Sequence, residues 1–174
     1  MQTSRRKFMT TAMRRAAGGG LVAVCATAAH AEAPADGDPK PSFKLVPIGK
    51  VEKEGQVTRL RIFDEYGDGL LGLDEWSHVN VLYWFDKNDT PAQRRMLRVH
   101  PRGDQKSPLT GVFACRAPVR PNLIALSVCK IVSVTGNVVT VEGLDAFDAT
   151  PILDLKPFIP SETKDLRTPA WTKQ

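Results

Sequence analysis

This chain has few of the residues on which metal and thiol chemistry depend. Its 174 residues include three cysteines and three histidines. Beyond residue 31 only Cys115 and Cys129 are left, and neither belongs to a C-x-x-C pair, so the sequence does not indicate a catalytic dithiol. The two thiols could pair in an oxidising compartment, although two separate, partly buried thiols are the simpler interpretation. Together with His78 and His100 they lack the short ligand spacing of a zinc site, so we expect no bound metal.

An excess of charge is also lacking once the first 31 residues are set aside. The chain has a net charge of +5, from 24 basic and 19 acidic residues. Residues 1–31 contain no acidic residue and five basic ones, which are Arg5, Arg6, Lys7, Arg14 and Arg15. The remaining part therefore balances 19 basic against 19 acidic groups. At the level of net charge, this balance excludes a strongly basic nucleic-acid-binding domain, although it does not exclude a local basic patch.

Residues 1–31 have the features of a twin-arginine export signal. The run SRRKFM at residues 4–9 carries the paired arginines, and a weakly apolar stretch follows at residues 16–28. AHA at residues 29–31 supplies the small-x-small pattern of a signal peptidase site. The apolar stretch is too short for a permanent membrane span. We therefore expect a periplasmic protein without a stable membrane anchor.

The rest of the chain predicts one mainly β domain. Residues 32–42 are rich in proline and predict a disordered leader, residues 43–160 form the expected domain, and residues 161–174 predict a flexible tail. Apolar residues in the domain recur with period two, which predicts short strands at 43–49, 57–63, 78–86, 95–100, 124–134, 138–142 and 152–155. Many short strands, separated by Gly and Pro, favour a single compact β-barrel of mostly antiparallel strands.

Two details of this pattern are specific. In the strand at 78–86, Val79, Val81, Tyr83 and Phe85 form one apolar face. The run TGN at residues 135–137 predicts a tight hairpin, because Gly and Asn tolerate the positive φ that such a turn needs.

Residues 67–72, GDGLLG, match two ligand motifs that the context does not support. A dinucleotide-binding G-x-G-x-x-G opens a helix, whereas the segment that follows here alternates like a strand. A calcium loop would use Asp64, Asp68 and Glu75, but Tyr66 stands where an oxygen ligand belongs. We interpret the stretch as a glycine-rich turn between strands.

Two polar segments suggest a binding site. Arg116, Arg120 and Asn122 lie in a loop stiffened by prolines, and arginines suit planar carboxylate or phosphate partners. A purely structural loop, with its arginines on backbone carbonyls, is an equal alternative. Glu142 and Asp145 crowd the exit of a strand, where they could accept ribose hydroxyls, favour a cation, or form salt bridges with those arginines.

The runs GVFACRAPVRPNLIALS at residues 111–127 and VEGLDAFDATPILDLKP at residues 141–157 resemble the signature of the TrmO family. This family is also called TsaA-like or YaeB-like. LLGLDEWSH at residues 70–78 and YWF at residues 83–85 match its upstream motif. The resemblance extends from about residue 43 to residue 160.

The resemblance implies a β-barrel methyltransferase that uses S-adenosyl-L-methionine, usually as a homodimer, and methylates N6 of threonylcarbamoyl-adenosine in tRNA. Carried over by motif position, the cofactor contacts are Asp86, Lys87, Arg116, Leu126, Glu142, Gly143, Leu144 and Asp145. Arg120 and Asn122 are assigned to the substrate, and no catalytic residue is assigned.

The chain departs from the family pattern at several of these positions. Leu123 and Ala125 stand where the family usually has Pro and Gly, Ala149 where it usually has Gly, and Asp86 where it usually has His. An exported protein would also meet neither tRNA nor free cofactor. The alternative function is therefore an exported ligand-binding or interaction protein that kept the barrel without methyltransferase activity.

Overall fold

The computed structural model describes residues 41–160 and 167–173. The expected export signal, nearly all of the leader and residues 161–166 of the expected tail lie outside the described residues. The chain divides into two units, Met1–Ser42 and Phe43–Gln174, and the following description concerns the second unit.

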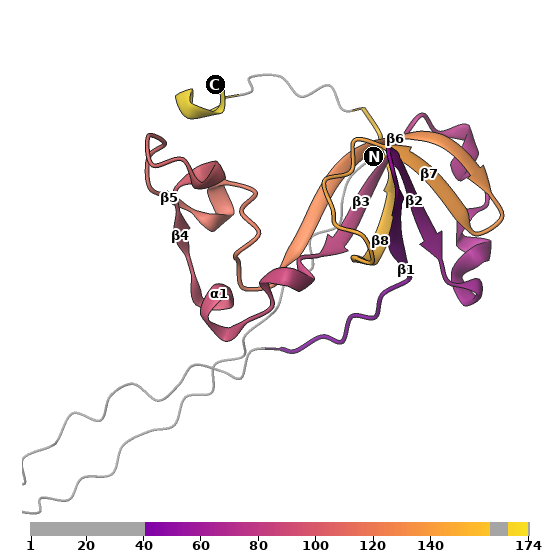
Figure 1. Cartoon of the computed structure of the whole chain (residues 1–174), viewed down its shortest axis with the longest axis horizontal. Coiled ribbons are helices and arrows are strands. Elements are labelled where there is room, and N and C mark those ends of the chain that lie inside the picture. The colour runs from indigo at the N-terminus through magenta and orange to yellow at the C-terminus, as the bar shows by residue number, and fades with distance from the viewer. Residues whose placement is uncertain (1–40, 161–166, 174) are drawn as a thin grey trace, which may run out of the picture. The chain divides into compact units, whose positions relative to one another are not determined.

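Six antiparallel strands form a closed barrel, as the sequence predicted (Figure 1). Around the barrel, each strand pairs with the next in the order β1 (Gly49–Glu54), β2 (Val57–Ile62), β7 (Val138–Glu142), β6 (Ile124–Thr135), β3 (His78–Trp84) and β8 (Pro151–Pro157). The barrel closes where β8 pairs with β1. Closure leaves no free sheet edge in the barrel.

The barrel core follows from the period-two pattern of its strands. Burial alternates strictly along β3, where Val79, Val81 and Tyr83 face inward, as predicted. Facing residues on β6 enter the same core, so that Val79 pairs with Cys129 and Tyr83 with Ala125. The predicted hairpin joins β6 to β7 through Gly136, whose φ of 54° is the left-handed conformation that favours glycine.

Each end of the barrel is covered by chain that the sequence did not assign to a regular element. At one end the 3-10 helices η1 (Asp64–Leu70) and η2 (Leu73–Glu75) place Leu70 in the core, with Tyr66 and Leu73 packed against it. At the other end residues 143–150 place Leu144 and Ala146 in the core. The glycine-rich motif is therefore part of two 3-10 turns that lead into β3.

Residues 86–122, here called the arm, leave the barrel after β3 and return to it at β6 (Figure 1). The arm contains no long element. It is made of η3 (Asp86–Asn88), α1 (Pro91–Arg95), β4 (Arg98–Val99), η4 (Pro101–Gly103), β5 (Thr110–Gly111) and η5 (Val112–Ala114). β4 and β5 form a separate two-stranded sheet.

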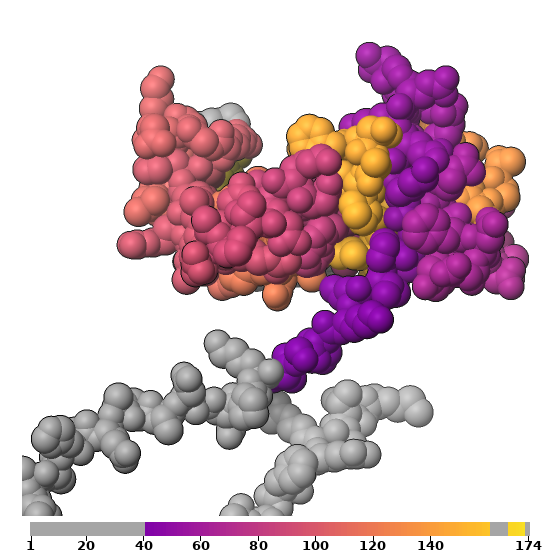
Figure 2. Space-filling view, turned by 60° about the horizontal axis from the view of Figure 1, so that its bottom comes forward, coloured from indigo at the N-terminus to yellow at the C-terminus, as the bar shows by residue number. Residues whose placement is uncertain are grey.

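Two predicted strands differ from the structure. The strand expected at 43–49 is wrong, because the strand begins only at Gly49 and residues 43–47 are exposed (Figure 2, indigo). Those residues are mostly apolar but have no strand partner. The strand expected at 95–100 shrinks to β4, because Arg95 ends α1.

The remaining described residues add two facts. In the expected tail, Ala170–Lys173 form the short 3-10 helix η6. None of the helices in the described part of the chain is both long and apolar enough to cross a membrane.

Candidate cofactor site

A buried tyrosine joins β3 to the segment after β7. The Tyr83 hydroxyl donates a hydrogen bond of 2.6 Å to the backbone carbonyl of Asp145 and lies 3.3 Å from Ser127 Oγ on β6. Tyr83 is buried, and its ring meets that of Phe85 edge-on at 5.7 Å. The hydroxyl therefore fixes the backbone of Asp145 beside β6.

The environment of this hydroxyl combines burial with polar groups. Burial raises the pKa of Tyr83 above its ordinary value, and the hydrogen bond with Ser127 lowers it. The Asp145 carboxylate raises the same pKa, whereas the more distant effect of the Arg116 guanidinium lowers it slightly. The direct hydrogen bond therefore orders the Asp145 segment, whereas Arg116 of the arm is exposed and its cofactor contact stays a prediction.

The outer surface of β6 is partly apolar. Leu126 points outward from β6, opposite Leu82 on β3, and is 44% exposed. Gly143 has a φ of 86°, and a Cβ added there would come within 3.8 Å of the Val128 carbonyl. Because 3.8 Å is an ordinary van der Waals distance, the positive φ, which other residues disfavour, is what favours glycine here. Leu144 next to it enters the core, so its predicted cofactor contact cannot be made by an exposed side chain.

The other predicted site residues have partners of their own. Glu142 forms an ion pair with Lys130 across the β6–β7 ladder at 3.2 Å, and Asp86 forms one with Lys87 at 3.1 Å in η3. Such exposed pairs contribute little to stability and leave the groups available to a ligand.

Arg120 and Asn122 differ from each other. The Arg120 guanidinium donates to the backbone carbonyls of Val112 and Cys115 within the arm, which is the structural arrangement that the sequence left open. The side chain of Asn122 is exposed. Their assignment to a substrate stays a prediction.

Sequence reasoning placed Tyr83 on the apolar face and did not use its hydroxyl. A tyrosine among buried valines was the available signal, because a buried hydroxyl needs a hydrogen-bond partner. The position of that partner, Asp145, depends on how residues 143–150 cross the end of the barrel.

The two cysteines lie in different environments. Cys129 is fully buried in the barrel and Cys115 is partly exposed in the arm, and both are free thiols. Burial raises the pKa of Cys129 to about 11.

A pocket of about 520 Å³ lies elsewhere, at the barrel end covered by η1 and η2. Its walls include Tyr66, Trp76 and Leu155, and none of the predicted site residues lines it. The candidate site is instead an open surface at the junction of barrel and arm. There a guanidinium suits a carboxylate, the acids suit a cation or a diol, and Leu126 suits a flat apolar ring.

Comparison with known proteins gives the family. Residues 40–163 match the tRNA-methyltransferase O N-terminal domain. A probable S-adenosyl-L-methionine-binding protein of Methanocaldococcus jannaschii is 47% identical over 116 residues, which cover 67% of this chain and 92% of that protein. The mouse tRNA (adenine(37)-N6)-methyltransferase is 40% identical over 101 residues, but these cover 58% of this chain and only 23% of that enzyme.

Solved structures agree with this match. A crystal structure of TrmO from Pseudomonas aeruginosa has a TM-score of 0.58 and 25% sequence identity, and the matched part covers 76% of this chain. The match spans 63% of the crystallised chain, so that chain has further parts without a counterpart here. With the family match and the shared barrel, this chain belongs to the family of the tRNA-methyltransferase O N-terminal domain.

Proposed function

We propose that this protein binds S-adenosyl-L-methionine at the junction of barrel and arm and transfers its methyl group to an acceptor. The observation that carries the proposal is the hydrogen bond from the Tyr83 hydroxyl to the Asp145 carbonyl, which orders the segment after β7 where predicted cofactor contacts gather. Relatives that share most of their length with this chain are named as probable binding proteins for this cofactor, which supports the same ligand.

The residues present fit the chemical groups of this cofactor. Arg116 can bind the amino-acid carboxylate, and the Asp145 and Glu142 carboxylates can face the sulfonium cation or the ribose diol. Leu126 offers an exposed apolar surface to the purine. Asp86 and Lys87 complete the proposed site from the arm.

The proposed chemistry depends mainly on placement. When bound, S-adenosyl-L-methionine would supply an electrophilic methyl group, whose bond to sulfur would break as the acceptor atom bonds to the carbon, with S-adenosyl-L-homocysteine as the leaving group. Methyl transfer of this kind needs positioning and exclusion of water more than a general base. In this chain Tyr83 holds the Asp145 backbone in place before the ligand arrives, and the arm would supply Arg116 to the same ligand.

The acceptor and the compartment are proposed on different grounds. The named activity of the mouse relative makes an adenine of tRNA the first acceptor to test. The paired Arg5 and Arg6, followed by an apolar stretch, support twin-arginine export to the periplasm, where a folded protein would arrive with its cofactor bound.

A second candidate function is a cofactor-binding protein without transferase activity. Two observations favour it. The relatives that match this chain over most of their own length have names that mention only cofactor binding. The matched part of the mouse enzyme is only 23% of that enzyme. We also propose a homodimer, because large apolar side chains such as Phe113 and Phe147 are mostly exposed in the single chain.

Calorimetry on the protein without residues 1–31 tests binding. We expect saturable heat with S-adenosyl-L-methionine, and Arg116→Ala should weaken it by about 1–3 kcal/mol through loss of a charge-assisted contact. Lys106→Ala, an exposed charge change elsewhere in the arm, is the control and should leave affinity unchanged. No heat at millimolar ligand would refute the proposal.

A transfer assay separates the two candidate functions. Radiolabelled methyl groups should appear in tRNA if the protein is a transferase with the acceptor of its mouse relative. Cofactor binding without methyl transfer to tRNA or to periplasmic extracts would favour the binding protein.

A further inference from the structure

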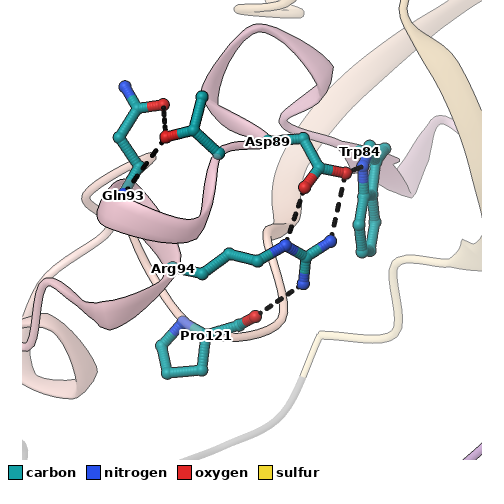
Figure 3. Close-up of polar contacts among 6 residues, drawn as sticks. Trp84, Asp89, Gln93, Arg94 and Pro121 are labelled. Carbon is teal, nitrogen blue, oxygen red and sulfur yellow. Dashed lines mark hydrogen bonds and ion pairs between the residues drawn. The ribbon is translucent and has the colours of Figure 1, made fainter.

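A polar cluster lies at the root of the arm, where the chain leaves and re-enters the barrel (Figure 3). It contains Trp84 at the end of β3, Asp89, Arg94 on α1 and the backbone carbonyl of Pro121. None of these residues is among the predicted cofactor or substrate contacts, so the cluster calls for an explanation of its own.

Arg94 makes three directed contacts in this cluster. Its Nε and Nη2 donate to the two carboxylate oxygens of Asp89 at 2.7 and 3.0 Å, which is a bidentate pair. Its Nη1 donates to the Pro121 carbonyl at 2.9 Å. Each guanidinium nitrogen therefore has a partner, and the three bonds leave the group little freedom to rotate.

Trp84, at the end of β3, contacts both members of the Arg94–Asp89 pair from the barrel. Its Nε1 donates to Asp89 Oδ2 at 3.2 Å, and the guanidinium carbon of Arg94 lies 5.3 Å from the centre of its ring. The helix that carries Arg94 is itself fixed at its start, since the Thr90 hydroxyl accepts a hydrogen bond from the Gln93 backbone.

The cluster spans the two passages of chain between barrel and arm. The Phe85 amide donates to the Leu123 carbonyl at 2.9 Å, next to the last paired residues of β3 and β6. Beyond that bond, Arg94 joins the outgoing segment at Asp89 to the returning segment at Pro121. The arm adds no residue to the buried cluster of the barrel, although its own Val112 is buried, so polar contacts at its root contribute to its direction.

Predicted ligand contacts flank the cluster on both passages. Asp86 and Lys87 lie just before Asp89 on the outgoing segment. Arg120 and Asn122 enclose Pro121 on the returning one, which also carries Arg116. A change in the angle between these segments would move Arg116 relative to Asp145, which belongs to the barrel.

We propose that Arg94 and Asp89 are positioning residues that set the arm at the angle at which Arg116 reaches the cofactor. This inference rests on the proposed function. It means that residues outside the site keep its barrel side and its arm side in position.

The charge state of the pair supports this role near neutral pH. The hydrogen bond from Arg94 holds the pKa of Asp89 below its ordinary value, against the effect of burial, and the bond from Trp84 acts in the same direction. Asp89 in turn raises the pKa of Arg94. Both groups stay ionised, so the bidentate pair persists.

The test compares Arg94→Gln and Asp89→Asn with Arg95→Ala as a matched control. Arg95 follows Arg94 on α1 and is exposed, and it has no hydrogen bond or ion pair among the described residues. Affinity for S-adenosyl-L-methionine is measured by calorimetry and the unfolding midpoint by circular dichroism. Both cluster variants should bind roughly tenfold more weakly or worse, with little change in midpoint, because misplaced contacts act on binding while the barrel core is intact.

The double variant gives a readout that a general loss of stability would not produce. If both residues act through one pair, Arg94→Gln with Asp89→Asn should bind no more weakly than either single variant. Arg94→Lys should restore little affinity, because an ammonium cannot make the bidentate pair and reach Pro121 as well.

Trp84 reports on the cluster without any ligand. In a background with Trp76→Phe and Trp171→Phe it is the only tryptophan left of three. Its emission should shift in Arg94→Gln and not in Arg95→Ala.

The outcomes separate this inference from the proposed function. Undiminished affinity in both cluster variants, beside weaker binding by Arg116→Ala, would overturn the positioning role and leave the proposed function standing. A wild-type protein that does not bind the cofactor would remove both. An equal loss in Arg95→Ala would also count against the inference, because it would show an effect of charge alone.

Discussion

The barrel and the arm are stabilised by different interactions. Every member of the buried apolar cluster comes from the strands of the barrel or from the segments that cover its ends, and none comes from the arm. The arm buries Val112 outside that cluster and has, in addition, hydrogen bonds from side chains to backbone carbonyls, such as those from Arg94 to Pro121 and from His100 to Ser107. The stability of the barrel is therefore spread over many buried side chains, whereas the position of the arm depends on a few specific contacts.

The same two regions differ in charge. Residues 86–122 carry eight basic and three acidic residues, whereas residues 43–85 and 123–160 together carry seven basic and eleven acidic ones. A neutral total thus conceals a basic arm beside an acidic barrel. The net charge, from which we argued against a nucleic-acid-binding domain, therefore does not describe the surface that a ligand would meet.

The largest expected effect tests the core of the barrel against the surface of the arm. Leu60 on β2 is fully buried, so Leu60→Ala should lower the free energy of unfolding by about 2–5 kcal/mol. Phe113 in the arm is 82% exposed, and Phe113→Ala should change it by less than about 0.5 kcal/mol. Urea denaturation measures both. Similar losses would show that the arm buries apolar surface in solution, for example against a second copy.

A second test uses one cysteine from each region. The pKa of Cys129 is raised to about 11, so at pH 8 roughly one thiol in a thousand is ionised, and the barrel wall also blocks access. Iodoacetamide should modify Cys115 at least about a hundredfold faster than Cys129. Labelling of Cys129 should increase with pH up to about 11, and denaturant should remove the difference. Mass spectrometry of the labelled peptides measures the rates.

Tyr83→Phe tests the polar contact that the barrel makes under the site. Removing the hydroxyl leaves the Asp145 carbonyl without its 2.6 Å donor and should lower the free energy of unfolding by about 1–2 kcal/mol. Cofactor affinity should fall with it, since the Asp145 segment is released. Tyr66→Phe is the control, because the Tyr66 hydroxyl makes no hydrogen bond within the described part of the chain. Equal effects of the two changes would contradict the role of the Asp145 contact.

The smallest effect concerns backbone strain. Ala149 has a φ of 61°, a left-handed conformation that glycine adopts without steric penalty. Ala149→Gly should raise the free energy of unfolding by about 0.5 kcal/mol, since relief of strain exceeds the added freedom of the unfolded chain. Ala114→Gly, in the arm at a position without positive φ, should lower it slightly or leave it unchanged. Thermal unfolding measures both, and a loss in Ala149→Gly would contradict the strain argument.

The sequence predicted the parts of the fold that have a periodic signal. β3 alternates between an apolar face and a mixed face, and a Gly-Asn turn marks the hairpin between β6 and β7, so the positions of these strands were nearly correct. β1 was misplaced because Val51 is the only large apolar residue in it, so the strand has no period-two signal. Its outward residues Lys50, Glu52 and Glu54 are charged and form ion pairs. The apolar run just before it has no partner strand.

The arm and the site were harder to predict for a physical reason. Arg94 and Pro121 lie 27 residues apart, and a guanidinium on a backbone carbonyl leaves no pattern of spacing. The resemblance supplied Arg116 and Asp145 as candidates. Only the fold shows that the backbone of Asp145 is bound by Tyr83.

The pairing of Trp84 with Ile124 has a consequence for how such proteins can diversify. Because the arm begins and ends on adjacent, hydrogen-bonded strands, its whole length is topologically equivalent to a hairpin turn. A two-residue turn could replace it without altering any other strand pairing in the barrel. The barrel can therefore accept insertions of different length and sequence at this position, and ligand specificity can change there while the fold is inherited intact.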